Sequence, residues 1–271
     1  MSRPYLPRLL CPAAAWCLLA VVLNLSVTAP APADEPQPET ATTTEADPPE
    51  PADTKPNGDK PEKPAEKPEK PKDLFAWRPL FDGKTLKGWK VPEFGGEGEV
   101  KVKKGVIVLG LGDPMTGITY EGELPKVNYE FRMEARRTMG IDFFATTTFP
   151  YGDSPCSFVV GGWAGTVVGL SCVDWYDASD NITTKFIAFK DKQWYRIRIR
   201  VSEQRIEAWI DDEKMVDLAT KGHKFTIRDE VDLCQPFGIC TYCTEGQIRK
   251  PEIRLLKPEE VAEIPVRDRW D

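Results

Sequence analysis

The stretch Y-E-F-R-M-E-A-R, residues 129–136, indicates the fold class of this chain. Its odd-numbered positions are apolar or aromatic, and its even-numbered positions are charged. Because successive side chains of a strand point to opposite faces, this period of two predicts a strand with one buried face. A strand of this kind needs partner strands and a core to pack on.

Similar runs recur along the rest of the chain. Apolar and β-branched segments separated by turn residues lie at 100–109, 141–149, 157–170, 195–216 and 236–256. Many short strands, with turns at about 8–12-residue spacing, are typical of an all-β sandwich or barrel. Weak helical character is confined to 258–263. The sequence predicts one all-β domain at 74–257, followed by a C-terminal tail at 258–271.

A two-residue turn at residues 202–203 would join two of these strands into a hairpin. It would place Arg198 opposite Glu207, an opposite-charge pair that stabilises neighbouring strands by roughly 0.2–1 kcal/mol. The same register sets Arg200 against Arg205, a like-charge pair. This conflict indicates that the turn is longer than two residues.

The N-terminus has the features of an export signal. Arg3 and Arg8 precede an apolar run, and Ala31-Pro32-Ala33 provides a small-residue cleavage site. Residues 1–33 therefore predict a signal peptide, or an uncleaved membrane anchor, because the apolar run is close to a bilayer span in length. We expect an exported protein that is periplasmic, on the cell surface or secreted, with membrane or cell-envelope tethering as an alternative.

Residues 34–73 contain no Val, Ile, Leu, Met or aromatic residue, and they repeat Glu, Lys and Pro. Such a segment cannot bury enough apolar surface to offset the entropy of ordering, so it predicts a disordered linker. The net charge of the chain is −7, and no basic cluster of the nucleic-acid-binding type is present. Nucleic acid is therefore not an expected partner.

Five of the seven cysteines lie outside the predicted signal peptide. Cys156 and Cys172 are symmetric about a Gly-rich turn, which predicts a disulfide between them in an exported domain. A second bridge would join Cys234 to Cys240 or Cys243. The alternative is that all five stay reduced as small buried apolar groups. Cys240-x-x-Cys243 has no second cysteine pair at zinc-ribbon spacing, so a zinc site is not expected.

Two segments carry candidate binding chemistry. The loop at 171–181 combines three carboxylates, an amide and two aromatic rings, which suits sugar hydroxyls and a stacking surface. The same oxygens would also suit calcium, and an ordinary Asx-rich turn remains the alternative. At 161–165, glycines surround Trp163 and allow a ligand to approach the backbone closely, or alternatively form a bulge in a strand.

The pair Glu130 and Glu134 superficially resembles the carboxylates of a glucanase. Four residues of strand separate them by about 13–14 Å, whereas a retaining pair is about 5–5.5 Å apart and an inverting pair about 6.5–9.5 Å. We therefore interpret them as part of an exposed, charge-alternating face. The single histidine, His223, excludes a site built from several histidines.

Trp77 followed by L-F-D-G-K-T-L-K-G-W, residues 80–89, resembles the opening signature of the 3-keto-disaccharide hydrolase family. The order of the strands at 194–217 also resembles paired strands of concanavalin A-like domains. The resemblance covers 77–256. It implies a concanavalin A-like jelly-roll β-sandwich of two antiparallel sheets and an exported hydrolase that acts on 3-keto-sugars, with carbohydrate as its partner.

The resemblance also implies a mechanism. A ketone at C3 acidifies the neighbouring C2–H, so that the glycosidic bond leaves by elimination and water then adds. This needs a base, a group that stabilises the enolate oxygen and no cofactor, although a divalent cation such as calcium is an alternative. We expect catalytic roles for Asp174 or Asp177 as base and Arg132 or His223 as oxyanion partner, and substrate binding by Trp163, Trp175, Asp180 and Asn181.

The chain departs from two features of the family. Members tend to show an Asn-Ser-Gly step where this chain has Met139-Gly140-Ile141, and a Tyr-Glu step where it has residues 157–160, S-F-V-V. These differences favour the alternative function, a non-catalytic carbohydrate-binding or surface-structural module with the same fold.

Overall fold

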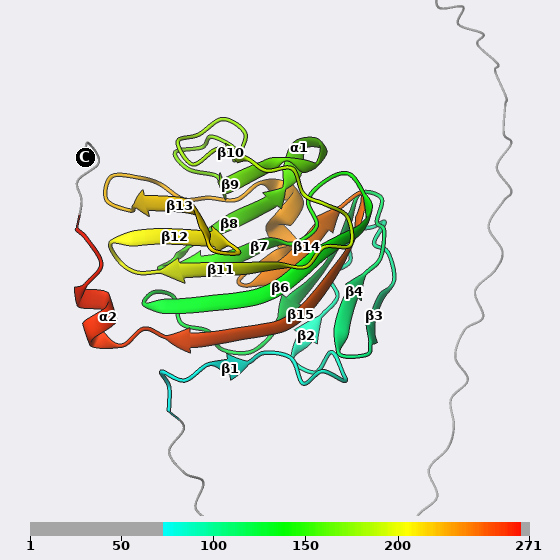
Figure 1. Ribbon diagram of the computed structural model, residues 1–271, viewed down its shortest axis with the longest axis horizontal. Helices are drawn as coiled ribbons and strands as arrows, with labels where there is room; N and C mark the ends of the chain where they lie inside the picture. The colour runs from blue at the N-terminus through cyan, green and yellow to red at the C-terminus, as the bar shows by residue number, and fades with distance from the viewer. Residues whose placement is uncertain (1–72, 267–271) are drawn as a thin grey trace, which may run out of the picture. The chain divides into compact units, whose positions relative to one another are not determined.

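The computed structural model describes residues 73–266, which form two antiparallel sheets on a shared core (Figure 1). The prediction of an all-β domain is confirmed. The predicted signal peptide and nearly all of the predicted linker lie outside the described residues.

The larger sheet has the order β13-β12-β11-β6-β15-β4-β3, with β1 pairing to β15. Its strands are β1 (Arg78–Pro79), β3 (Val100–Lys103), β4 (Val106–Leu109), β6 (Tyr129–Gly140), β11 (Tyr195–Val201), β12 (Arg205–Ile210), β13 (Glu213–Ala219) and β15 (Thr244–Leu255). The long strand β15 lies in the middle of this sheet, between β6 and β4.

The smaller sheet has the order β10-β9-β8-β7-β14-β5-β2. Its strands are β2 (Trp89–Lys90), β5 (Met115–Tyr120), β7 (Thr146–Tyr151), β8 (Ser154–Gly161), β9 (Val167–Ser171), β10 (Lys185–Phe186) and β14 (Gly238–Tyr242). Three short helical segments complete the described chain, namely α1 (Gly162–Gly165), the 3-10 helix η1 (Asp229–Cys234) and α2 (Pro258–Ala262). The last of these agrees with the helical character expected at 258–263.

The core follows from the alternation seen in the sequence. Phe131 on β6, Ile197 on β11 and Phe158 on β8 are fully buried in one apolar cluster that both sheets share. Phe131 contacts Phe237 edge-on, with 4.9 Å between ring centroids. Side chains at the intervening positions point away from the core, so each sheet has an outer face.

The hairpin of β11 and β12 is shifted from the two-residue-turn register. Arg198 lies opposite Trp209, and Arg200 lies opposite Glu207, not Arg205. The longer connection removes the like-charge pair and replaces it with an opposite-charge pair, in agreement with the conflict noted in the sequence.

The expectation that Glu130 is exposed is wrong. Its side chain is 1 % exposed, although it points to the outer face of the larger sheet. The guanidinium groups of Arg198 and Arg254 each lie 2.6 Å from its carboxylate, and Arg200 lies 3.4 Å away. Long cationic side chains on neighbouring strands cover the carboxylate, which the pattern of one strand does not reveal.

The predicted disulfide between Cys156 and Cys172 is absent, because all five described cysteines are free thiols. Cys156 is buried in the core, and burial raises the pKa of its thiol. The Cys172 thiol instead donates a hydrogen bond to Asp177 Oδ1 at 3.4 Å. The predicted hairpin itself is present, since β8 pairs with β9 across the Gly-rich turn.

Candidate functional site

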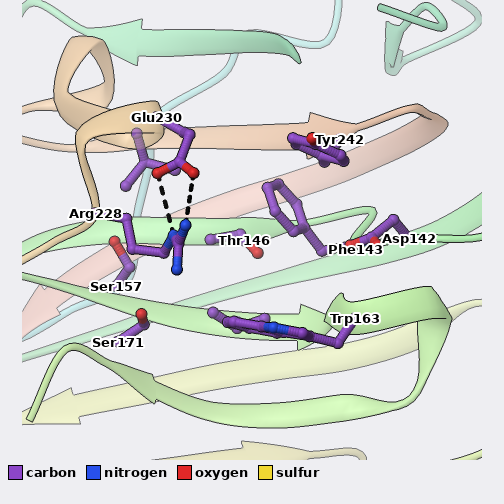
Figure 2. Close-up of a pocket in the computed structure, with 11 residues that line it drawn as sticks. Asp142, Phe143, Thr146, Ser157, Trp163, Ser171, Arg228, Glu230 and Tyr242 are labelled. Atoms are coloured by element: carbon purple, nitrogen blue, oxygen red, sulfur yellow. Dashed lines mark hydrogen bonds and ion pairs between the residues drawn. The ribbon is translucent and has the colours of Figure 1, made fainter. Parts of the chain in front are cut away.

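A cavity of about 240 Å³ lies on the outer face of the smaller sheet (Figure 2). Thr146 on β7, Ser157 on β8 and Ser171 on β9 line it from neighbouring strands. Because Phe158 and Leu170, the neighbours of these serines in the chain, point into the core, the serine side chains must point outward. The sheet therefore places a row of hydroxyl groups beneath the cavity.

One of these hydroxyls has no protein partner. Thr146 is 1 % exposed, and its Oγ1 makes no hydrogen bond. By contrast, Ser157 Oγ is 2.9 Å from Thr148 Oγ1. Buried polar atoms are normally paired, so an unpaired hydroxyl in the lining of a cavity indicates a place for a polar ligand atom or water.

Trp163 forms one side of the cavity and is 40 % exposed. It lies on a tight turn in which Trp163 and Ala164 have φ values of 48° and 64°. The Asp142 carboxylate holds this turn by accepting hydrogen bonds from the backbone N–H groups of Ala164 at 3.0 Å and Phe143 at 2.7 Å. At Gly165, where φ is 97°, a Cβ would lie 2.6 Å from the Ile141 carbonyl oxygen.

Arg228 provides the positive charge of the cavity. Its guanidinium donates to both carboxylate oxygens of Glu230, at 2.7 and 3.1 Å, and to Asp177 Oδ2 at 2.5 Å. The hydrogen bonds with Glu230 raise the pKa of Arg228 and, in turn, lower the pKa of Glu230. The Arg228 Cζ lies 5.9 Å from the centroid of the Trp163 ring, so a cation and an aromatic face border the same space (Figure 2).

The residues predicted from the sequence are divided among several places. Trp163 lines the cavity, and Asp177 reaches it through Arg228. Asp174 is elsewhere on the same loop, where its Oδ2 is 2.7 Å from His223 Nδ1. His223 has a side chain that is 5 % exposed. The structure thus pairs the two residues with each other, not with the cavity.

Arg132 lies on the opposite side of the sandwich. It belongs to the outer face of β6 in the larger sheet, where it pairs with Glu252 at 2.7 Å and lies 4.0 Å from the Trp77 ring. The core separates this face from the cavity. The expectation that Arg132 serves the same site as Trp163 therefore does not fit the structure. Side chains alternate between the two faces of a strand, and Arg132 points outward from the larger sheet, whereas the cavity lies on the smaller sheet.

Trp175, Asp180 and Asn181 lie on the loop between β9 and β10. The Asn181 amide donates to the carbonyl oxygens of Leu170 and Asp177, both at 2.7 Å, so this side chain organises the loop. Asp180 and Asn181 line a separate hollow of about 300 Å³. Trp175 is 68 % exposed, with Lys224 Nζ 4.8 Å from its ring centroid.

Several cavity residues were not expected from the sequence, namely Asp142, Phe143, Thr146, Ser157, Ser171, Arg228, Glu230 and Tyr242. They come from five separate segments, and the pairing of the strands brings them together. The available signal was the alternation of β8, in which Ser157 interrupts an apolar run. Among residues 73–266, no group of three or more His, Cys, Asp or Glu side chains is arranged to hold a metal ion.

A family model described as a 3-keto-alpha-glucoside-1,2-lyase-like domain matches residues 76–249. The chain belongs to this family. The lyase-like domain therefore includes every strand from β1 to β14 and the first part of β15. Among curated proteins, none matches the sequence significantly.

Solved structures similar to the lyase-like domain include a candidate glycosyl hydrolase from Parabacteroides distasonis, with 15% identity and a TM-score of 0.42. That match covers 67% of this chain and 94% of the other. The carbohydrate-binding module CBM66 from Bacillus subtilis matches with 12% identity and a TM-score of 0.40, over 62% and 95%. The Crh5 transglycosylase matches with 12% identity and a TM-score of 0.46, over 69% and 88%.

Within the lyase-like domain, in the part that the structure describes, no helix is long and apolar enough to cross a membrane.

Proposed function

We propose that the cavity binds a sugar that carries a ketone at C3 and promotes elimination of its glycosidic bond. The observation that carries this proposal is the meeting of Trp163, Arg228 and the unpaired Thr146 hydroxyl in one cavity. An indole face suits the C–H face of a pyranose ring, a guanidinium suits a developing oxyanion, and a hydroxyl suits a sugar hydroxyl. Membership of the lyase-like family supports the same substrate class.

In this proposal Arg228 donates hydrogen bonds to the C3 oxygen and stabilises the negative charge that develops there. Glu230 lies beside Arg228, and its carboxylate is the base in this proposal. It takes the C2 proton, and the electron pair of that bond forms the enolate. When the enolate collapses, the C3=O bond re-forms, a C1=C2 double bond forms and the C1–O bond breaks. The departing oxygen takes the proton from Glu230, which returns to its ionised state.

We also propose that the sandwich is of the concanavalin A-like type and that the protein is exported from the cytoplasm. The former rests on the family resemblance and the two-sheet architecture. The latter rests on the basic and apolar pattern of residues 1–33.

Proton exchange tests the proposed chemistry directly. A 3-keto-α-glucoside incubated with the protein in D₂O should exchange its C2 proton faster than without protein, as followed by NMR. Glu230→Gln should abolish this acceleration, whereas Glu134→Gln, on the outer face of the larger sheet, should retain it. Binding of the sugar without any acceleration in the unaltered protein would contradict the enzyme proposal.

A second function, binding without catalysis, is favoured by the pairing of the carboxylates. Asp142 accepts two backbone N–H groups, and both oxygens of Glu230 face Arg228. Carboxylates engaged in this way are weaker bases. Titration calorimetry distinguishes the two functions, since a binding module would bind the intact glycoside and leave its linkage unchanged.

A further inference from the structure

Trp163 and Trp175 are the two exposed tryptophans of residues 73–266, at 40 % and 68 % exposure. Each lies in a pair of consecutive non-glycine residues with left-handed backbone. The φ values are 48° and 64° for Trp163 and Ala164, and 51° and 69° for Asp174 and Trp175. Such conformations cost free energy and persist where surrounding contacts fix them, often at ligand sites.

Both loops are fixed by a carboxylate. Asp142 holds the Trp163 turn through backbone N–H groups. Asp174 plays the equivalent part at Trp175, where its Oδ1 accepts the Lys224 N–H at 2.9 Å and its Oδ2 contacts His223. The Trp175 ring is therefore presented to solvent by an ordered loop.

One segment of chain links the two tryptophans. Residues 172–174 pair with 224–226 through backbone hydrogen bonds, and Phe225 is buried in the core. Alternation then places the side chains of Lys224 and Arg228 on the opposite face from Phe225. Each of these two cations lies near one exposed tryptophan, with Lys224 Nζ 4.8 Å from the Trp175 centroid and Arg228 Cζ 5.9 Å from the Trp163 centroid.

The spacing of the two cations exceeds one sugar ring. Four residues of extended chain span about 13 Å. The cavity beside Trp163 is about 240 Å³, which is below the usual range for a drug-sized ligand and suits one ring. A ligand that touches both tryptophans must therefore contain several linked rings.

We propose that Trp175 and Lys224 form a second sugar-binding platform, termed the distal platform, and that the ligand of this protein is an oligosaccharide. One terminal sugar occupies the cavity, and a later sugar of the same chain stacks on Trp175. The Lys224 ammonium donates hydrogen bonds to hydroxyls of that sugar. This inference rests on the proposed function, because it takes the cavity to be a sugar site.

A panel of α- and β-linked gluco-, galacto- and manno-oligosaccharides tests it, each sugar oxidised to the 3-ketone at its non-reducing end. Disaccharides and the matching tetrasaccharides are titrated calorimetrically into the full chain and into Trp175→Ala. At least one tetrasaccharide should bind about fivefold or more tightly than its disaccharide. In Trp175→Ala, its affinity should fall to the level of the disaccharide.

Phe186→Ala is the matched control, because Phe186 is 71 % exposed on β10 and belongs neither to the cavity nor to the distal platform. It should keep the preference for the tetrasaccharide. Equal affinity of all disaccharides and tetrasaccharides for the unaltered chain would overturn the distal platform and leave the proposed function intact. Absence of binding by every member of the panel would overturn both.

Discussion

The outer faces of the two sheets use the same residue types in opposite ways. On the larger sheet, Trp209 is 8 % exposed, with the Arg198 Cζ 3.7 Å from its ring centroid. On the same face, arginines surround the buried Glu130 carboxylate. On the smaller sheet, Trp163 is 40 % exposed, and Arg228 lies 5.9 Å from its ring.

The difference shows how a paired network and a binding site can be told apart in one molecule. Where a cation covers a buried ring, as at Trp209, and arginines cover a buried carboxylate, as at Glu130, the residues stabilise the scaffold. Where a ring is exposed and the hydroxyl of Thr146 lacks a partner, the residues can still form contacts. An exposed ring beside an unpaired hydroxyl, not residue type, distinguishes the site.

The largest expected effect is on catalysis in the cavity of the smaller sheet. Arg228→Met should lower the turnover of a 3-keto-α-glucoside about 100- to 1,000-fold, because one donor to a developing oxyanion is lost. The free energy of unfolding should change by less than about 1 kcal/mol, since the pair is partly exposed. Arg196→Met is the control, because Arg196 is 62 % exposed on the other sheet. Equal turnover of both variants would refute the role of Arg228.

The network on the larger sheet should show the reverse behaviour. Glu130→Ala should lower the free energy of unfolding by about 3 kcal/mol, because it removes a buried carboxylate that Arg198, Arg200 and Arg254 share. Glu134→Ala should cost about 1 kcal/mol, since Glu134 itself is 20 % exposed and its partner Lys250 is 68 % exposed. Urea denaturation measures both. A similar loss in the free energy of unfolding for both variants would mean that the burial of Glu130 does not make its ion pairs more important for stability than those of Glu134.

Replacing Trp209 and Trp163 separately by alanine sharpens the comparison. Trp209→Ala should lower the free energy of unfolding by about 3 kcal/mol and leave sugar affinity unchanged, because it removes a buried ring and its cation contacts. Trp163→Ala should lower sugar affinity about fivefold or more, with little loss of stability. Thermal unfolding and calorimetric titration of each variant are the measurements. A binding defect in Trp209→Ala would show that the larger sheet also contacts sugar.

The smallest expected effect concerns acid stability. Hydrogen bonds from Arg254 lower the pKa of Glu260 from 4.5 to about 2. A lowered folded-state pKa contributes stability above the unfolded-state value, and this contribution is lost as the pH falls toward 2. Unaltered protein should therefore exceed Glu260→Gln in stability at pH 7, by less than about 2 kcal/mol, and the difference should shrink between pH 4.5 and 2. A difference that is constant over this range would contradict the assignment.

The sequence predicted the elements better than the site. The period of two in β6 and β11 identified strands and their buried faces, because burial depends on local alternation. The turn between β11 and β12 is longer than two residues, so the register of the hairpin differs from the predicted one. In the observed register Arg200 lies opposite Glu207. Trp163 stood out because glycines surround it.

The remaining cavity residues could not be predicted in the same way. Thr146, Ser157, Ser171 and Arg228 are ordinary residues in their local context, and the pairing of β7, β8 and β9 brings them together. Similarly, Asp174 and Asp177 are three residues apart in sequence, yet the first contacts His223 and the second contacts Arg228. Proximity along a loop did not determine which surface each carboxylate faces.

The placement of the last two strands bears on how the protein is made. β14 fills the gap between β7 and β5, and β15 fills the gap between β6 and β4, so each sheet is completed by a late segment. A ribosome must therefore synthesise almost the entire domain before either sheet can close. Until then, the inner strands keep unpaired edges that invite association with other chains. Truncation before residue 238 removes the centre of both sheets, not a dispensable edge.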